Sequence, residues 1–112
     1  MEKNAVKEFD KAKERNIQEL QILEQNLQNT FLQKQAFQME LRETQAALKE
    51  LEKSGDEVFK IIGQLMIKTE KKDMKEELTS KEKILDMRIK SFDRQERTLS
   101  EKLEMLQKEF LK

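Results

Sequence analysis

The sequence predicts a mostly α-helical chain that forms one domain: a long antiparallel two-helix coiled coil with a central β-hairpin. Helix breakers are rare, because the 112 residues include no Pro and only two Gly. Charged residues make up 41% of the chain with equal numbers of each sign, which is typical of long solvated helices rather than of a globular core. Apolar residues recur at heptad spacing on both sides of a single β-favouring stretch.

The first helix is expected over residues 2–53, where Glu, Lys, Gln, Leu and Ala dominate and all favour helix. Two heptad positions carry its apolar seam: Leu20, Leu27, Leu41 and Leu48 on one, and Leu23, Phe37 and Leu51 on the other. A seam of this kind predicts a partner helix along one side. The helix is expected to end at Lys53, which suits the negative end of the helix dipole, with Gly55 in a left-handed conformation just beyond it.

A β-hairpin is expected over residues 57–69, because β-branched and aromatic residues form two short runs on either side of Gly63. Both of its faces are apolar, and a two-stranded hairpin alone is at best marginally stable and has two open edges. We therefore expect other chains to complete it. The candidate interface residues are Val58, Phe59, Ile61, Ile62, Leu65, Met66 and Ile67. A hydrophobic loop between the helices is the alternative interpretation.

The second helix is expected over residues 71–111. Asp73 and Glu76 have the spacing of a capping box, and Thr69 is an alternative cap. Its apolar seam carries Leu78, Leu85, Phe92, Leu99 and Leu106, with Ile89, Leu103 and Phe110 at the companion positions.

The two seams match when the chain is folded back about Gly63. This register places Leu41 opposite Leu85 and Leu27 opposite Leu99. Polar positions also match, with Thr44 opposite Glu82 and Thr30 opposite Glu96, and Lys34 faces Phe92 with its ammonium in water. The agreement predicts an intramolecular antiparallel coiled coil. A parallel dimer of long helices is the alternative, but Gly55 and Gly63 interrupt it.

Pairing in this register stops before the chain ends, since Lys112 reaches back only to Glu14. Apolar residues near both termini are therefore expected to be poorly covered, and exposed apolar clusters often mark interaction sites. The candidates for binding other proteins are Val6, Phe9, Ile17, Met105, Phe110 and Leu111. Ordinary fraying of the helix ends is the alternative interpretation.

Composition argues against several other functions. The chain contains no His and no Cys, which removes the commonest general base, the commonest metal ligand and all thiol chemistry. There is no Gly-rich phosphate loop and no nucleophile–base pair, so neither an enzyme nor a cofactor is expected. Net charge is zero, which gives no attraction to nucleic acid. No apolar stretch of about 18 residues is present, so no membrane contact is expected. The first residues lack the apolar core of a secretory signal, which makes a cytoplasmic location the default.

Several local motifs carry a family resemblance. They are Val58-Phe59-Lys60 and Ile62-Gly63-Gln64-Leu65-Met66-Ile67-Lys68 in the hairpin, Gln33-Lys34-Gln35 and Ala47-Leu48-Lys49-Glu50-Leu51-Glu52 before it, and Arg94-Gln95-Glu96 after it. With these motifs the chain resembles the β-class subunits of archaeal prefoldin over about residues 17–112. The α-class has a second hairpin, for which this chain has no room.

The resemblance implies a hetero-hexamer of two α-class and four β-class subunits. Their hairpins would build an oligomeric β-barrel platform, and the coiled coils would extend from it. The implied activity is ATP-independent: non-native proteins are captured at the coiled-coil tips and passed to a group II chaperonin. A structural coiled-coil adaptor or scaffold that binds no client is the alternative function.

The predicted register can be tested by crosslinking. Cys residues introduced by Leu27→Cys and Leu99→Cys should form a disulfide within one chain, because a disulfide needs Cα atoms within about 7 Å of each other. Non-reducing electrophoresis of the purified double variant would detect it as a monomer of increased mobility. A disulfide formed only between chains would contradict the intramolecular hairpin.

Overall fold

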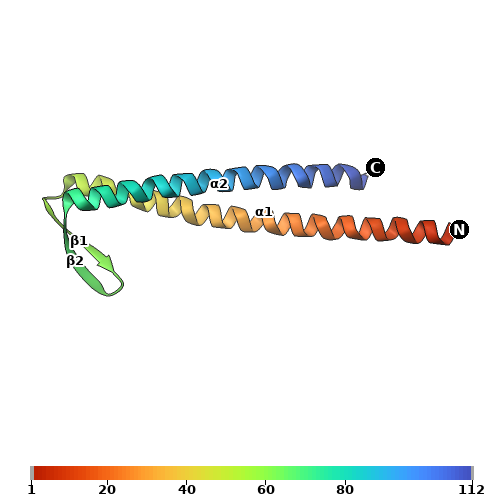
Figure 1. Cartoon of the computed structure of the whole chain (residues 1–112), viewed down its shortest axis with the longest axis horizontal. Coiled ribbons are helices and arrows are strands. Elements are labelled where there is room, and N and C mark those ends of the chain that lie inside the picture. Colours follow the sequence, from red (N-terminus) through yellow and green to blue (C-terminus); the bar gives the residue numbers. More distant parts are fainter. Residues whose placement is uncertain (1, 112) are drawn as a thin grey trace. The chain divides into compact units, whose positions relative to one another are not determined.

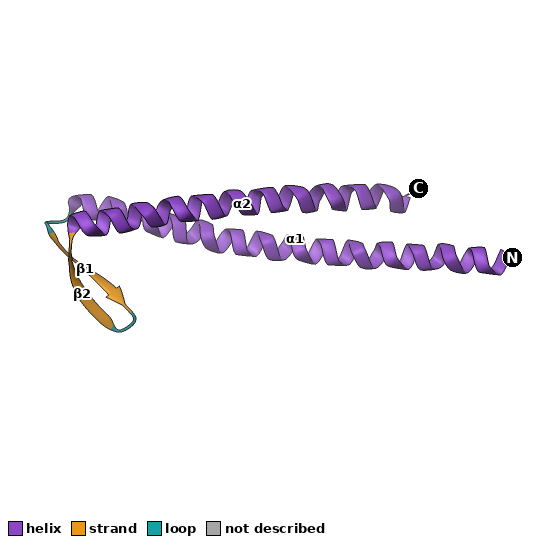
Figure 2. Ribbon diagram, viewed as in Figure 1, coloured by secondary structure: helices purple, strands orange, loops and turns teal. Residues whose placement is uncertain are grey.

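Two long helices separated by an antiparallel β-hairpin make up the chain, and the predicted fold class is confirmed. In the computed structural model the backbone is described for residues 2–111, and the side chains for residues 7, 8 and 10–111. The order of elements is α1 (Glu2–Lys53), β1 (Glu57–Ile62), β2 (Leu65–Glu70) and α2 (Lys71–Leu111), as Figures 1 and 2 show. Both Gly residues lie outside the helices, so nothing interrupts the backbone hydrogen bonding of α1 or α2.

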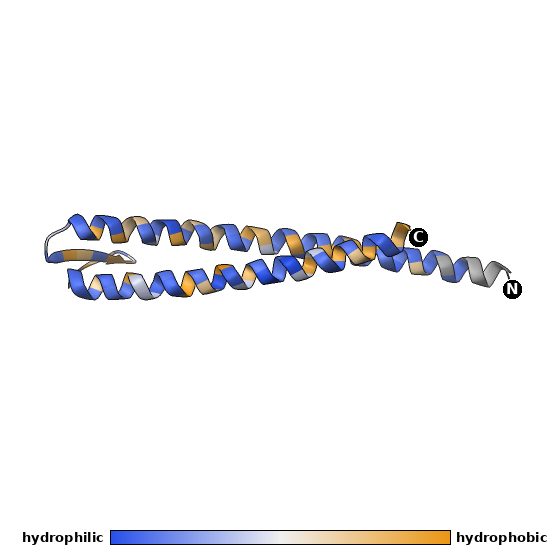
Figure 3. Ribbon diagram, turned by 90° about the horizontal axis from the view of Figure 1, so that it is seen from above, coloured by the Kyte–Doolittle hydropathy of each residue, from blue (hydrophilic) through white to orange (hydrophobic). Residues whose placement is uncertain are grey.

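The chain divides into two compact units. Unit 1 consists of Met1–Lys34 and Ser91–Lys112, and unit 2 consists of Gln35–Lys90. Each unit contains a segment of α1 and a segment of α2, and unit 2 also contains the hairpin. Apolar residues recur as short bands along both helices with polar residues between them (Figure 3), which is the pattern that an apolar seam produces.

Unit 2 holds the most deeply buried apolar residues of the described chain. Leu51, Leu85 and Ile89 are buried, with Leu85 only 4% exposed. Contacts between the helices flank this core: the guanidinium of Arg88 lies 5.8 Å from the centroid of the Phe37 ring, a cation–π distance. The two helix segments of unit 2 are therefore joined by an apolar seam, with the cationic side chain of Arg88 beside it.

The seam of unit 1 combines half-buried leucines with a buried threonine. Its half-buried leucines are Leu20, Leu23, Leu27, Leu99, Leu103 and Leu106. Thr30 lies in the same seam and is buried, and its hydroxyl donates a hydrogen bond of 2.8 Å to the carbonyl oxygen of Asn26. The hydroxyl of Thr44 in unit 2 likewise donates to the carbonyl of Glu40 at 2.8 Å. A threonine can enter the seam because its donor is satisfied within its own helix.

The environment of the Lys34 ammonium differs from the prediction, which placed it in water. Its Nζ lies 2.5 Å from Oδ1 of Asp93 and 3.5 Å from Oε2 of Glu96, and the side chain is only 19% exposed. The hydrogen bond that the Lys34 ammonium donates to Asp93 raises the pKa of Lys34 above its usual value. The negative charges of Glu96 and Asp93 add to this effect, while desolvation of the ammonium opposes it. The ammonium turns to these acids because their oxygens replace its lost hydration.

The junction between the helices corrects two predicted caps. Gly55 does not adopt a positive φ; instead, the backbone N–H of Ser54 donates to the carbonyl of Leu51 at 3.1 Å and ends α1. α2 begins at Lys71 directly after β2, so neither Asp73 nor Thr69 is its first capping residue.

Lys71 links the two helices at this junction. Its N–H donates to the carbonyl of Asp56 at 2.8 Å, and its ammonium donates to the carbonyls of Glu52 and Ser54, each at 3.2 Å. A cation here satisfies free carbonyls at the negative end of the α1 dipole. A side chain distant in sequence therefore replaces the local cap that was expected at the end of α1.

The hairpin has a two-residue turn. The strand ladder runs from Glu57 opposite Glu70 to Ile62 opposite Leu65, so the reversal is centred between Gly63 and Gln64 rather than at Gly63. Gly63 has a φ of 61°, whereas none of the described non-Gly residues has a positive φ. Glycine in the first central position with positive φ is typical of a type II′ turn, whose twist matches that of the strands.

The two glycines should respond differently to substitution. Gly63→Ala should lower the free energy of unfolding by about 1 kcal/mol, because an L-residue is strained at this φ. Gly55→Ala is the matched control: it has no positive φ, and nothing lies within 4 Å of an added Cβ, so its stability should be equal to or above that of the unmodified chain. Urea unfolding followed by circular dichroism, at one protein concentration, measures both. Equal losses in the two variants would contradict this account of the turn.

Candidate functional site

The first candidate surface is one face of the hairpin, here called the hairpin face and made of Phe59, Ile61 and Met66. Ile61 and Met66 lie directly opposite each other across the strands. The three side chains are 60%, 72% and 69% exposed, respectively. An ion pair borders this face, with Nζ of Lys68 lying 2.9 Å from Oε1 of Glu57. The result is an apolar surface with a charged edge, which is the usual organisation of a protein–protein interface.

The opposite face of the hairpin is turned toward α2. Val58, Lys60 and Thr69 are half-buried there, and Nζ of Lys60 lies 3.4 Å from Oε2 of Glu77 in α2. Ile62, Leu65 and Ile67 are on this side as well and remain exposed. The structure thus divides the predicted interface residues between two faces, and Val58 is the one that is partly covered within unit 2.

Both edges of the hairpin are open. In the described part of the chain the sheet contains only β1 and β2. Each strand therefore has one row of backbone donors and acceptors without a strand partner, and such edges can pair with strands of other chains.

The candidate binding residues near the termini lie in unit 1. Ile17, Met105, Phe110 and Leu111 are all exposed. The side chains of Val6 and Phe9 lie outside the described part of the chain. Of the candidates, Met105 lines a groove, whereas Ile17, Phe110 and Leu111 do not. The structure therefore brings one predicted residue together with others that were not predicted.

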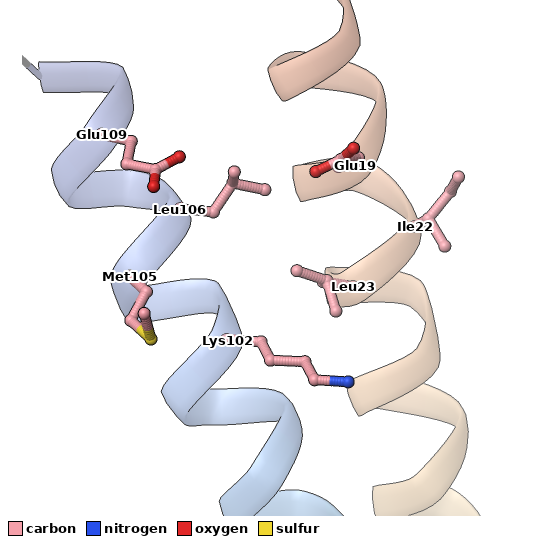
Figure 4. A pocket seen from close by; sticks show the side chains of 7 residues that line it. All are labelled: Glu19, Ile22, Leu23, Lys102, Met105, Leu106 and Glu109. Atoms are coloured by element: carbon pink, nitrogen blue, oxygen red, sulfur yellow. The ribbon is translucent and has the colours of Figure 1, made fainter.

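This groove, here called the terminal groove, has a volume of about 390 Å³ and runs between the α1 and α2 segments of unit 1. It is lined by Glu19, Ile22 and Leu23 from α1 and by Lys102, Met105, Leu106 and Glu109 from α2. Leu23 and Leu106 point toward each other across it, and Lys102 extends from α2 toward α1 (Figure 4). Ile22 is 57% exposed and Met105 is 66% exposed. An apolar floor with charged groups at its margins can bind an apolar segment of another chain.

Ile22 was not predicted from the sequence as a functional residue, and Leu23 and Leu106 were assigned only to the seam. A signal was present: each helix carries an apolar doublet, Ile22-Leu23 in α1 and Met105-Leu106 in α2. In a doublet one residue enters the seam while its neighbour remains at the margin. Which two doublets face each other depends on the register of the two helices. The groove could therefore be located only in the structure.

The acidic side chains of the described residues are dispersed along the helices and strands. The described residues contain no group of three or more His, Cys, Asp or Glu side chains that could hold a metal ion. Neither helix, over its described residues, has an apolar stretch long enough to cross a membrane. The two candidate surfaces that the geometry offers are the hairpin face and the terminal groove, both apolar and exposed.

Comparisons with known proteins agree on one family. A family model described as "Prefoldin subunit" matches residues 5–112. The prefoldin subunit beta of Thermococcus onnurineus is 41% identical over 90 residues, which cover 79% of this chain and 78% of that protein. That of Archaeoglobus fulgidus is 40% identical over 88 residues, covering 77% and 76%. The crystal structure of the prefoldin beta subunit from Thermococcus strain KS-1 has a TM-score of 0.81 and 36% identity, covering 88% of this chain and 89% of that one.

Charge placed on the hairpin face should prevent assembly through it. In the double variant Ile61→Asp/Met66→Asp, carboxylates would have to be buried in an apolar interface, which costs several kcal/mol. Sedimentation, alone and with a candidate α-class partner, should show loss of the larger species, while circular dichroism keeps its helical signal.

The matched control for this test is Ile84→Asp/Met87→Asp, which alters two exposed apolar residues of α2 in the same unit. It should assemble as the unmodified chain does. A hairpin variant that sediments unchanged would show that this face is not an interface.

Proposed function

Because this chain belongs to the prefoldin subunit family and matches its beta subunits, we propose that it is a β-class subunit of an ATP-independent holdase. In this proposal the hairpin assembles the complex, and the terminal groove captures non-native proteins. The groove is the single observation that carries the proposal, because it offers apolar surface in an open, shallow form.

The shape of the groove supports binding of unfolded chains rather than of one defined ligand. Ile22 and Met105 are the more exposed of its apolar residues, and a methionine side chain adapts to partners of varied shape. A non-native protein presents apolar segments of no fixed sequence, which favours an adaptable surface over a rigid pocket. Terminal residues Ile17, Phe110 and Leu111 would extend the same apolar surface.

Assembly would supply the affinity that one shallow groove lacks. The hairpin face and the open edges of β1 and β2 support pairing with α-class subunits and with further β-class copies, in the hetero-hexamer and β-barrel platform that the family resemblance implies. Several grooves on one complex would hold a client through effective concentration, even though each contact is weak.

Release to a group II chaperonin is the further step that the family resemblance implies. No Gly-rich phosphate loop is present in the sequence, which supports a cycle without nucleotide hydrolysis by this chain. The cytoplasmic location expected from the sequence stays a prediction. The competing function is a structural adaptor without client binding. An adaptor should not protect unfolded proteins from aggregation, so a measurement of protection distinguishes it from a holdase.

Polar substitution in the groove should weaken protection of clients. The variant Ile22→Ser/Met105→Ser removes exposed apolar side chains, so the coiled coil should fold and assemble normally. Losing apolar contact worth on the order of 1–2 kcal/mol at each groove should weaken client binding about tenfold. Light scattering of a denatured test protein, diluted into buffer containing the chaperone complex, measures the protection.

A matched control, Met39→Ser/Met87→Ser, changes two exposed methionines of unit 2 and should protect as well as the unmodified chain. Equal protection by the groove variant would exclude the groove as the capture site. Absence of protection by the unmodified complex would favour the adaptor.

A further inference from the structure

We propose, on the basis of the proposed function, that the terminal groove selects its client segments by charge as well as by apolarity. Its preferred occupant is an apolar segment of a non-native protein with Lys or Arg at the end that lies against Glu19 and Glu109. Three observations carry this inference: the placement of the charges around the groove, their lack of partners, and the apolar floor between them.

The charges around the groove are separated by sign. Glu19 from α1 and Glu109 from α2 lie on opposite sides of the groove toward one end, while the ammonium of Lys102 lies toward the other end (Figure 4). The two carboxylates come from different helices, so the basic end of a bound segment would meet negative charge on both sides of the groove. The groove is therefore polarised along its length.

These three charges are free to bind a ligand. Glu19, Lys102 and Glu109 take part in no ion pair or hydrogen bond with the described residues. Some other charges of unit 1 are paired: Lys34 binds Asp93 and Glu96, and Nζ of Lys108 lies 3.6 Å from Oε1 of Glu104. An arriving Lys or Arg would gain two carboxylates without breaking an existing pair.

The apolar floor increases the effect of these charges. A single exposed ion pair changes affinity only about two- to fivefold. A client that covers Ile22, Leu23, Met105 and Leu106 excludes water beside the carboxylates, which strengthens their attraction for a cation. Two carboxylates acting on one basic residue should together give about a tenfold preference, and several grooves on one complex would multiply it.

This preference identifies a class of client. Natural sequences often place charged residues beside their aggregation-prone apolar segments, where they act as gatekeepers. A groove with an apolar floor and two carboxylates at one end fits those apolar segments whose flanking gatekeeper is Lys or Arg. Segments flanked by Asp or Glu at the same end would be repelled by Glu19 and Glu109.

Three labelled peptides with one shared apolar core test the inference. They differ only at one end, which carries two Lys, two Ser or two Glu residues, and fluorescence anisotropy measures their affinity for the purified full chain. The Lys peptide should bind about tenfold more tightly than the Glu peptide, with the Ser peptide between them. Raising the salt concentration should reduce this difference.

Paired substitutions locate the preference. Glu19→Gln/Glu109→Gln should bring the three affinities together while leaving binding of the Ser peptide unchanged. The control Glu24→Gln/Glu101→Gln removes two exposed carboxylates that lie outside the groove on the same two helices, and it should keep the full preference.

Each other outcome overturns a different statement. Equal binding of all three peptides to the unmodified chain overturns charge selection and leaves the proposed function standing. A preference for the Lys peptide that survives Glu19→Gln/Glu109→Gln overturns selection by these two carboxylates, and it also leaves the proposed function standing. Failure of every peptide to bind overturns capture by the groove itself. Association between copies that is lost in Glu19→Gln/Glu109→Gln, seen by sedimentation without peptide, would assign the groove to a second copy of this chain.

Discussion

The apolar seam between α1 and α2 is the interaction on which the rest of this protein depends. A single helix cannot shield its leucines from water, because its apolar face is buried only where a partner helix covers it. Two helices still cover little: among the described residues no side chain is fully buried, and the buried apolar ones are Leu51, Leu85 and Ile89. A fold with so thin a core leaves much of its apolar surface available to other molecules.

The polar residues within the seam determine how the helices are aligned. In unit 1, Lys34 binds Asp93 and Glu96 across the two helices, and Thr30 satisfies its own hydroxyl within α1. A shift in register would leave the Lys34 ammonium half-buried without its acids, which is costly. Oε1 of Glu96 is already buried without a hydrogen-bond partner among the described residues. These polar contacts favour the one alignment in which Leu23 faces Leu106 and the terminal groove exists.

The sequence by itself determined the arrangement of elements. Heptad spacing on both sides of residues 57–69, together with the absence of Pro, was sufficient to predict two helices and a hairpin. The exposed apolar hairpin was also predictable, because Phe59, Ile61 and Met66 have no core of their own to enter. Gly63 could be assigned to the turn because the turn requires a positive φ, which glycine adopts without the strain that other residues would have. All of these are local properties, which depend on neighbouring residues and on periodicity.

Only the tertiary structure decided the contacts between residues distant in sequence. Lys71 satisfies carbonyls of Glu52 and Ser54, so α1 ends without the left-handed Gly55 that local rules predict. Lys34 turns to Asp93 because the return helix places an acid beside it. Glu19 and Glu109 line the same end of the groove for the same reason, since their positions depend on the alignment of two helices. Periodicity predicts which face of a helix is apolar, but the neighbours of a charged side chain at its margin depend on how the chain folds back.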